Sequence, residues 1–149
     1  AVEVVAVLTL TAVIMAMAGP PLARVHSRAK LRQAVDDLAA NHSLARASAI
    51  QNGRIAKLHI DPASNRHWVD VDTGGRKRMG IPLRGVTTVG PIVWFRKGDL
   101  TSNRTLLCFD PRGMPTTVGD CGPADANIVF TLLDHKDTVR ITGLGRLIR

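Results

Sequence analysis

Arginines near the end of the chain have the type and spacing to bind phosphate groups. In the stretch VRITGLGRLIR, Arg140 falls in a predicted strand, and Arg146 and Arg149 follow on a glycine-flexed tail. Guanidinium forks bind phosphate oxygens, and the net charge of +8 favours acidic partners. The pattern predicts contacts to successive phosphates of an acidic partner, although a solvated basic tail would account for the same residues.

Two cysteines have the spacing to close a short loop. Cys108 lies in a predicted strand and Cys121 in the loop DCGPAD. In an oxidising compartment a disulfide between them would contribute about 3 kcal/mol to stability, and two unpaired thiols are the alternative. No second Cys or His pair stands at zinc spacing, so these residues do not predict a metal site.

Motifs for catalysis or cofactor binding are incomplete or missing. The run from Asp70 begins like a calcium loop, but its fifth position is Gly74 and its twelfth is Ile81, where a bidentate acid is needed. The stretch 143–145 is a bare GxG without a following helix, and the chain has no Walker A, H-E-x-x-H or G-x-S-x-G motif. We therefore predict no catalytic residue, no cofactor and no metal, and we do not expect an enzyme.

The first element that must position these residues is an apolar run, AVEVVAVLTLTAVIMAMAGP. As a helix it would be roughly 27 Å long, close to the ~30 Å hydrocarbon core of a bilayer. Residues 1–25 are therefore predicted to form a transmembrane helix. A secretory signal peptide would need basic residues before the run, and a buried core helix would not be so uniformly apolar.

Glu3 is the acidic residue within this run. A carboxylate at the centre of a membrane helix costs about 2.5 to 3.5 kcal/mol, so such a residue usually has a partner. Glu3 could pair with a cation from a neighbouring subunit. Its position near the end of the helix also allows its side chain to reach the interface without any such partner.

Residues 26–53 are predicted to form an amphipathic helix that continues the first. Asn52 and Gly53 supply its end. Arg24, Arg28, Arg32 and Asp36 line a polar stripe. The opposite stripe, expected to pack on a folded domain, alternates in steps of four and three residues and consists of Leu31, Val35, Leu38, His42, Ala45 and Ala49.

Residues 54–149 alternate between short β-type runs and turns. The runs are IAKLHI, HWVDVD, GPIVWF, TLLCF, IVFTLL and TVRIT, and the turns are rich in Gly, Pro, Asn and Asp. A basic turn at 76–78 and a tight connection at 134–137 lie among them. The predicted fold is therefore α+β, with a long N-terminal helix packed on a C-terminal antiparallel β-domain that ends in a basic tail.

The N-terminal pattern resembles that of the type IV pilins and the pseudopilins of type II secretion, in which a glutamate lies near the start of an apolar helix and a proline follows. Glu3 and Pro20 keep the family's spacing. The resemblance implies that two mature residues and a basic leader precede Ala1. It also implies a single-pass protein of the bacterial inner membrane with a periplasmic domain, which assembles with other pilin subunits through Glu3 and Pro20.

Two further stretches are similar to the GspH/FimT subgroup, whose members read close to "DL...L..ARSEAI..N". These are DLAANHSLARASAIQNG at 37–53 and CFDPRG at 108–113. The similarity implies a minor pilin, with a GspH-type minor pseudopilin of the type II secretion system as the alternative. In FimT-like members a Gly-Arg-x-Arg motif captures DNA during uptake, so the resemblance implies backbone-directed binding of double-stranded DNA without sequence preference. Gly145 and Arg146 match it, but Arg149 stands one position later than the motif requires.

Overall fold

The computed structural model of the chain describes residues 2–71, 81–82 and 99–149. The predicted strand GPIVWF, the basic turn at 76–78 and the calcium-like run beyond Val71 lie outside these residues. Helix α1 (Val2–Asn52) comes first. The strands that follow are β1 (Ala56–Asp61), β2 (Arg66–Val71), β3 (Ile81–Pro82), β4 (Leu100–Ser102), β5 (Leu106–Phe109), β6 (Ala126–Leu132), β7 (His135–Ile141) and β8 (Leu147–Ile148).

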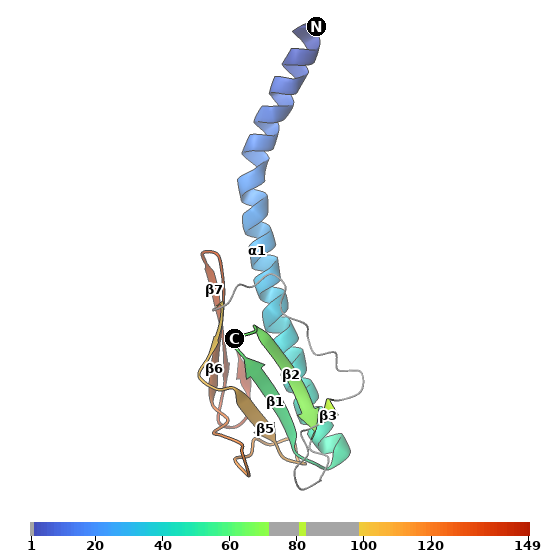
Figure 1. Cartoon of the computed structure of the whole chain (residues 1–149), viewed down its shortest axis with the longest axis vertical. Coiled ribbons are helices and arrows are strands. Elements are labelled where there is room, and N and C mark those ends of the chain that lie inside the picture. Colours follow the sequence, from blue (N-terminus) through green and yellow to red (C-terminus); the bar gives the residue numbers. More distant parts are fainter. Residues whose placement is uncertain (1, 72–80, 83–98) are drawn as a thin grey trace.

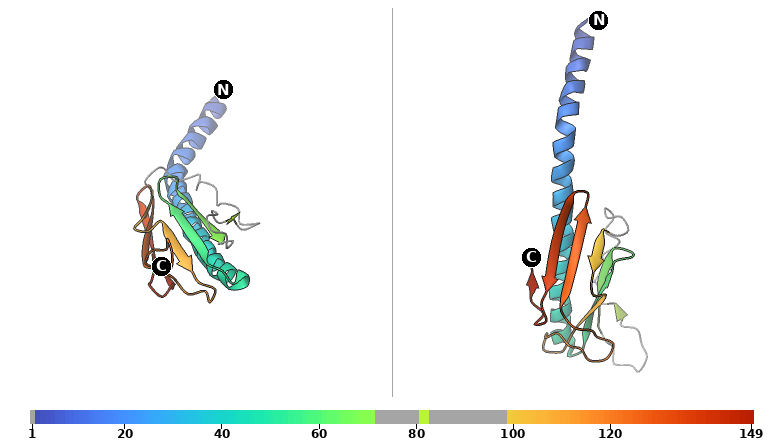
Figure 2. Two further views of the ribbon diagram at one scale, coloured as in Figure 1. Left: turned by 60° about the horizontal axis from the view of Figure 1, so that its bottom comes forward. Right: turned by 90° about the vertical axis from the view of Figure 1, so that its left-hand side faces the viewer.

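The strands form two antiparallel sheets, with the orders β3-β2-β1-β5 and β4-β6-β7-β8. Both sheets pack on the second half of α1, and its first half extends away from them (Figure 1). Figure 2 shows the same arrangement from two further sides. The sheets are joined where the Asn65 side-chain oxygen accepts a bond from the Leu100 amide at 3.3 Å. This α+β, pilin-like architecture is the fold that the sequence predicted.

The amphipathic stripe of α1 is confirmed. All six of its predicted members are buried, while Arg28, Arg32 and Asp36 on the polar stripe are exposed. A second buried line runs beside the stripe at intervals of seven residues and consists of smaller or polar residues, namely Ser27, Ala34, Asn41 and Ser48. These small side chains let the β-strands approach the helix closely.

The helix ends where the sequence predicted. Gly53 has a φ of +59°, and the amides of Gly53 and Arg54 donate to the carbonyls of Ile50 and Ala49. This left-handed glycine satisfies the last helical carbonyls. At the other end, α1 continues through position 20 without a break. The described part of the chain holds no helical stretch that is both long and apolar enough to cross a membrane.

One hydrophobic core lies between α1 and the two sheets. Successive residues of β1, β2 and β6 alternate between buried and partly exposed, as expected for strands with one face on a core. Large and fully buried side chains come from both sheets and from the helix. They include Leu38, Leu58, Ile60, Leu107, Phe109, Ile128, Phe130 and Ile141.

The two GspH/FimT-like stretches contact each other in the fold. Arg46 on α1 donates through its Nε to the carbonyl of Gly113 at 3.0 Å. The turn around Gly113 is held by Asp110, whose Oδ1 accepts the amides of Arg112 and Met114, both at 2.9 Å. These bonds to the charged form lower the pKa of Asp110. The helix signature and the Phe-Asp-Pro turn are therefore two sides of one contact.

A disulfide joins Cys108 to Cys121. Cys108 lies opposite Lys57 of β1, which places its side chain on the outer face of the first sheet. Both cysteines are nevertheless buried, because the loop that carries Cys121 folds over this face. The bridge closes a separation of 13 residues, for which we expect about 3 kcal/mol of stabilisation.

A buried polar pair lies between α1 and β2. The Asn41 Nδ2 and the His67 Nδ1 are 2.7 Å apart, and the second His67 nitrogen has no hydrogen-bond partner among the described residues. Burial lowers the pKa of His67 from 6.5 to about 4, because the charged ring would lose its hydration. His67 is therefore neutral in the folded protein at neutral pH.

We predict that acid weakens the fold partly through His67. Unfolded His67 takes up a proton near pH 6.5 and folded His67 only near pH 4, so its contribution is complete above pH 6.5, falls as pH is lowered and levels off below pH 4. Urea unfolding between pH 7 and 4 measures this. His67→Gln, which keeps an acceptor for Asn41, should flatten the curve, and exposed His26→Gln should not. Parallel curves for wild type and His67→Gln would contradict the prediction.

Candidate functional site

The first half of α1 is an apolar helix that no other described part of the chain covers. Large apolar side chains from Val2 to Met15 are exposed. Thr9 and Thr11, its polar residues after Glu3, donate their hydroxyls to helix carbonyls three and four residues earlier. Glu3 lies exposed in the first helical turn, where its charge complements the helix dipole. Position 20, whose proline was predicted to take part in assembly, lies within the same continuous helix.

The C-terminal residues form a hairpin, which corrects the prediction of a flexible tail. Strand β8 pairs with β7. Between them, the Thr142 amide donates to the Arg146 carbonyl at 2.9 Å, and the Gly145 amide donates to the Thr142 carbonyl at 2.7 Å. Gly145 has a φ of +72°, so it gives the chain a tight turn and not a loose one. Gly145 therefore allows the tail to fold back on β7.

Arg149 was predicted to be free for phosphate, but it is paired with the helix. Its Nη2 lies 2.7 Å from the Asp36 Oδ1, and the two side chains are 52% and 61% exposed. The reason is strand geometry: Arg149 continues β8 on the side that faces α1. An exposed pair of this kind contributes at most about 1 kcal/mol, so a phosphate could compete with Asp36 for Arg149.

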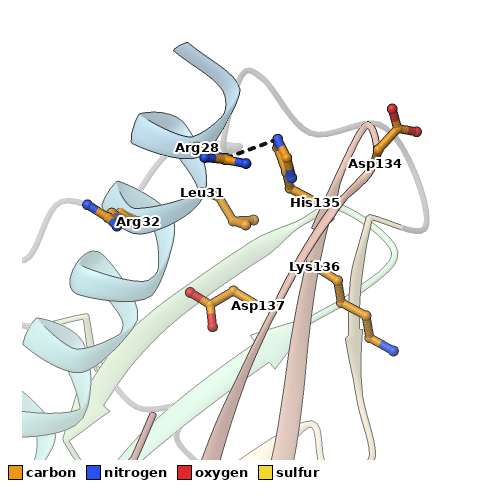
Figure 3. A pocket seen from close by; sticks show the side chains of 7 residues that line it. All are labelled: Arg28, Leu31, Arg32, Asp134, His135, Lys136 and Asp137. Carbon is orange, nitrogen blue, oxygen red and sulfur yellow. Dashed lines mark hydrogen bonds between the residues drawn. The ribbon is translucent and has the colours of Figure 1, made fainter. Parts of the chain in front are cut away.

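Arg140 and Arg146 remain exposed on the hairpin. Arg140 lies opposite Ile148 and Asn127 in the sheet, on its outer face. Lys136 shares this face because it precedes Arg140 by four residues along β7, and Figure 3 shows its side chain pointing away from α1. Lys136 was not among the predicted site residues, although strand alternation from Arg140 would have found it.

The outer face of the first sheet carries another polar cluster. His59 Nε2 lies 2.9 Å from Asp70 Oδ2, and the His59 ring stacks on Trp68 with 4.8 Å between ring centroids. Burial lowers the pKa of His59 more than Asp70 raises it. Asp70, the first position of the calcium-like run, is thus engaged with His59. The described residues contain no group of three or more potential metal ligands.

A long apolar helix whose second half packs on a small β-domain defines the class of pilin-like subunits. Within this class, the family model described as "Type II transport protein GspH" matches residues 34–145, and the chain belongs to that family of minor pilins and pseudopilins. Members are structural proteins of the cell envelope that assemble with other pilin subunits.

Two solved structures share the fold, and both are of the type IV minor pilin FimU from Pseudomonas aeruginosa. One is 21% identical and covers 81% of this chain and 88% of its own, with a TM-score of 0.57. The other is 19% identical and covers 79% and 90%, with a TM-score of 0.53. No curated protein sequence matched the chain significantly.

Gly145 can be tested against a matched glycine. A Cβ on Gly145 would lie 2.6 Å from the Cγ of Pro115, whereas a Cβ on Gly119, at a φ of +75°, would meet nothing within 4 Å. We predict that Gly145→Ala lowers the free energy of unfolding by about 1 to 3 kcal/mol more than Gly119→Ala, because only Gly145 is also crowded. Urea denaturation measures the difference. Equal losses would show that the close approach of Pro115 does not restrict the side chain at position 145.

Proposed function

We propose that this chain is a minor type IV pilin of the FimT/GspH kind, a structural and assembly subunit. Before assembly, residues 1–25 anchor it in the bacterial inner membrane with the β-domain in the periplasm. On assembly, the same helix packs in the core of the filament. The observation that supports this proposal is the exposed apolar half of α1, which extends beyond both sheets (Figure 1). Such a surface needs a lipid or protein environment.

Glu3 is the proposed assembly residue. It is the only glutamate in the chain and stands among exposed valines in the first turn of α1. A carboxylate surrounded by apolar side chains gains stability from a cation, and a neighbouring subunit can supply one. Pro20, which lacks an amide hydrogen, is the place where we propose that α1 adapts its path to the filament.

We predict that Glu3→Ala inserts into membranes normally but fails to enter filaments. Removal of the carboxylate makes the helix more apolar, so insertion does not suffer, while the attraction between subunits is lost. Carbonate extraction of membranes measures insertion, and immunoblotting of sheared filaments measures incorporation. Thr11→Ala is the control, because the Thr11 hydroxyl donates to carbonyls of its own helix. Wild-type incorporation of Glu3→Ala would refute the assembly role.

The C-terminal hairpin is the proposed DNA contact. Arg140 and Arg146 present exposed guanidinium groups on one end of the second sheet, and Lys136 extends the basic face along β7 by about 13 Å. Contacts of this kind address the phosphate backbone and carry no base readout. Arg149, on the side that faces α1, adds to them only when it leaves Asp36 and its side chain turns past the end of β8.

We predict that full-length protein in detergent binds duplex DNA of any sequence, with an affinity that falls as salt rises. Arg146→Gln and Arg140→Gln should each lower the log-log salt slope by about one, and Arg149→Gln by less, because Arg149 must first leave Asp36. Asp36→Asn should increase affinity by freeing Arg149. Exposed Arg66→Gln, on the other sheet, is the control.

The secretion pseudopilin is the second candidate function, favoured by the description of the matching family model. Fluorescence anisotropy with unrelated duplexes separates the two. If the protein shows no binding at low salt, or if the hairpin substitutions leave the slope unchanged, the DNA role falls and the pseudopilin becomes the better assignment. The Glu3 experiment keeps its meaning in either case, since both kinds of subunit assemble.

A further inference from the structure

A cavity of about 460 Å³ lies between α1 and the tip of the β6–β7 hairpin. In Figure 3, Arg28 and His135 face each other across it, and Asp137 points toward the helix. The side chains of Asp134 and Lys136 point away. A second cavity, of about 230 Å³, follows along the same seam, and Arg32 and Asp137 border both. The volume suits a small polar ligand.

A hydrogen bond to His135 positions the Arg28 side chain at the cavity, where it could bind an anion. Its Nε donates to the His135 Nε2 at 3.4 Å, which makes Nε2 the acceptor and Nδ1 the donor nitrogen of the ring. No other bond of the Arg28 guanidinium is recorded among the described residues, which leaves its terminal N–H groups for a bidentate acceptor such as phosphate. Arg32 lies one helical turn further along and can add a second cation when its flexible side chain turns.

Asp137 gives the cavity a negative group opposite the helix arginines. One of its carboxylate oxygens accepts the Thr138 amide at 2.9 Å, and the charge remains available to a cation. Arginine on one wall and a carboxylate on the other would weaken the binding of a bare anion. The same arrangement complements a ligand that carries both a phosphate and an ammonium group.

The cavity lies at the membrane side of the β-domain if residues 1–25 are in the bilayer. Arg28 follows that segment by only a turn of helix, about 5 Å. The β6–β7 hairpin extends along α1 toward its N-terminus (Figures 1 and 2). At the hairpin tip, Leu133 is 73% exposed and has a φ of +54°, an unusual place for a leucine. A side chain of this kind gains by entering the interfacial region of a membrane.

We propose that this cavity binds the headgroup of a zwitterionic phospholipid. Arg28, assisted by Arg32 and the His135 Nδ1, holds the phosphate, Asp137 holds the ammonium group, and Leu133 enters the interface beside it. Binding is non-covalent and fixes the β-domain against the membrane before the subunit is extracted into a filament. The inference rests on the proposed membrane orientation of residues 1–25.

The test uses full-length protein in a phosphate-free maltoside detergent, titrated with soluble glycerophosphoethanolamine and, separately, with inorganic phosphate. Chemical shifts of the His135 ring report occupancy. We expect saturable shifts with glycerophosphoethanolamine and weaker binding of phosphate. Arg28→Gln should weaken the first at least about tenfold and Arg32→Gln less, while Arg54→Gln, outside the cavity, should have no effect. Asp137→Asn should remove the preference between the two ligands.

Two outcomes would decide against the proposal. Equal affinity for both ligands in the wild type would mean a phosphate site without headgroup selection. No saturable shift with either would mean that the cavity is not a binding site. If circular dichroism shows that Arg28→Gln is misfolded, Asp137→Asn carries the test instead. Carbonate extraction is measured in parallel: if the chain does not insert but the soluble ligand still binds, the membrane orientation fails and the site stands.

Discussion

The apolar stripe of α1 extends beyond the β-domain that covers it, and the rest of the structure depends on this mismatch. From Leu31 to Ala49 the stripe is buried by both sheets. From Val2 to Met15 the apolar side chains have no described partner. One continuous helix therefore has two different surroundings. Its second half packs in the core of a small domain, and its first half exposes apolar side chains that the domain does not cover.

A disulfide and a hydrogen bond between helix and loop reinforce the core of the small β-domain. The disulfide closes the loop over β5, and Arg46 ties the same loop back to α1 through Gly113. Both contacts involve residues of the two GspH/FimT-like stretches. The two stretches therefore form one contact between the helix and the loop. Its residues are far apart in sequence because one surface belongs to α1 and the other to the loop that follows β5.

Charges collect along the seam between α1 and β7. Arg28 faces His135 near one end, and Arg149 pairs with Asp36 further along. Between them Arg32 and Asp137 border both cavities. The seam is polar because the helix turns its arginine stripe toward the edge of the second sheet, where hydrophobic cover ends. Because of these charges, α1 contributes side chains both to the proposed headgroup site and to the ion pair that holds Arg149.

The sequence by itself determined the fold class, the extent of the amphipathic helix and its end at Asn52, because these depend on local periodicity and on the conformational freedom of Gly53. It also identified the cysteine pair and most of the strands. Only the tertiary structure decided that the C-terminal glycines form a tight hairpin, that Arg149 returns to Asp36 and that His67 lies buried beside Asn41. Each of these depends on segments remote in sequence meeting across a sheet or a helix face. Residue types and spacings alone do not predict these contacts, because they form only once the strands are paired.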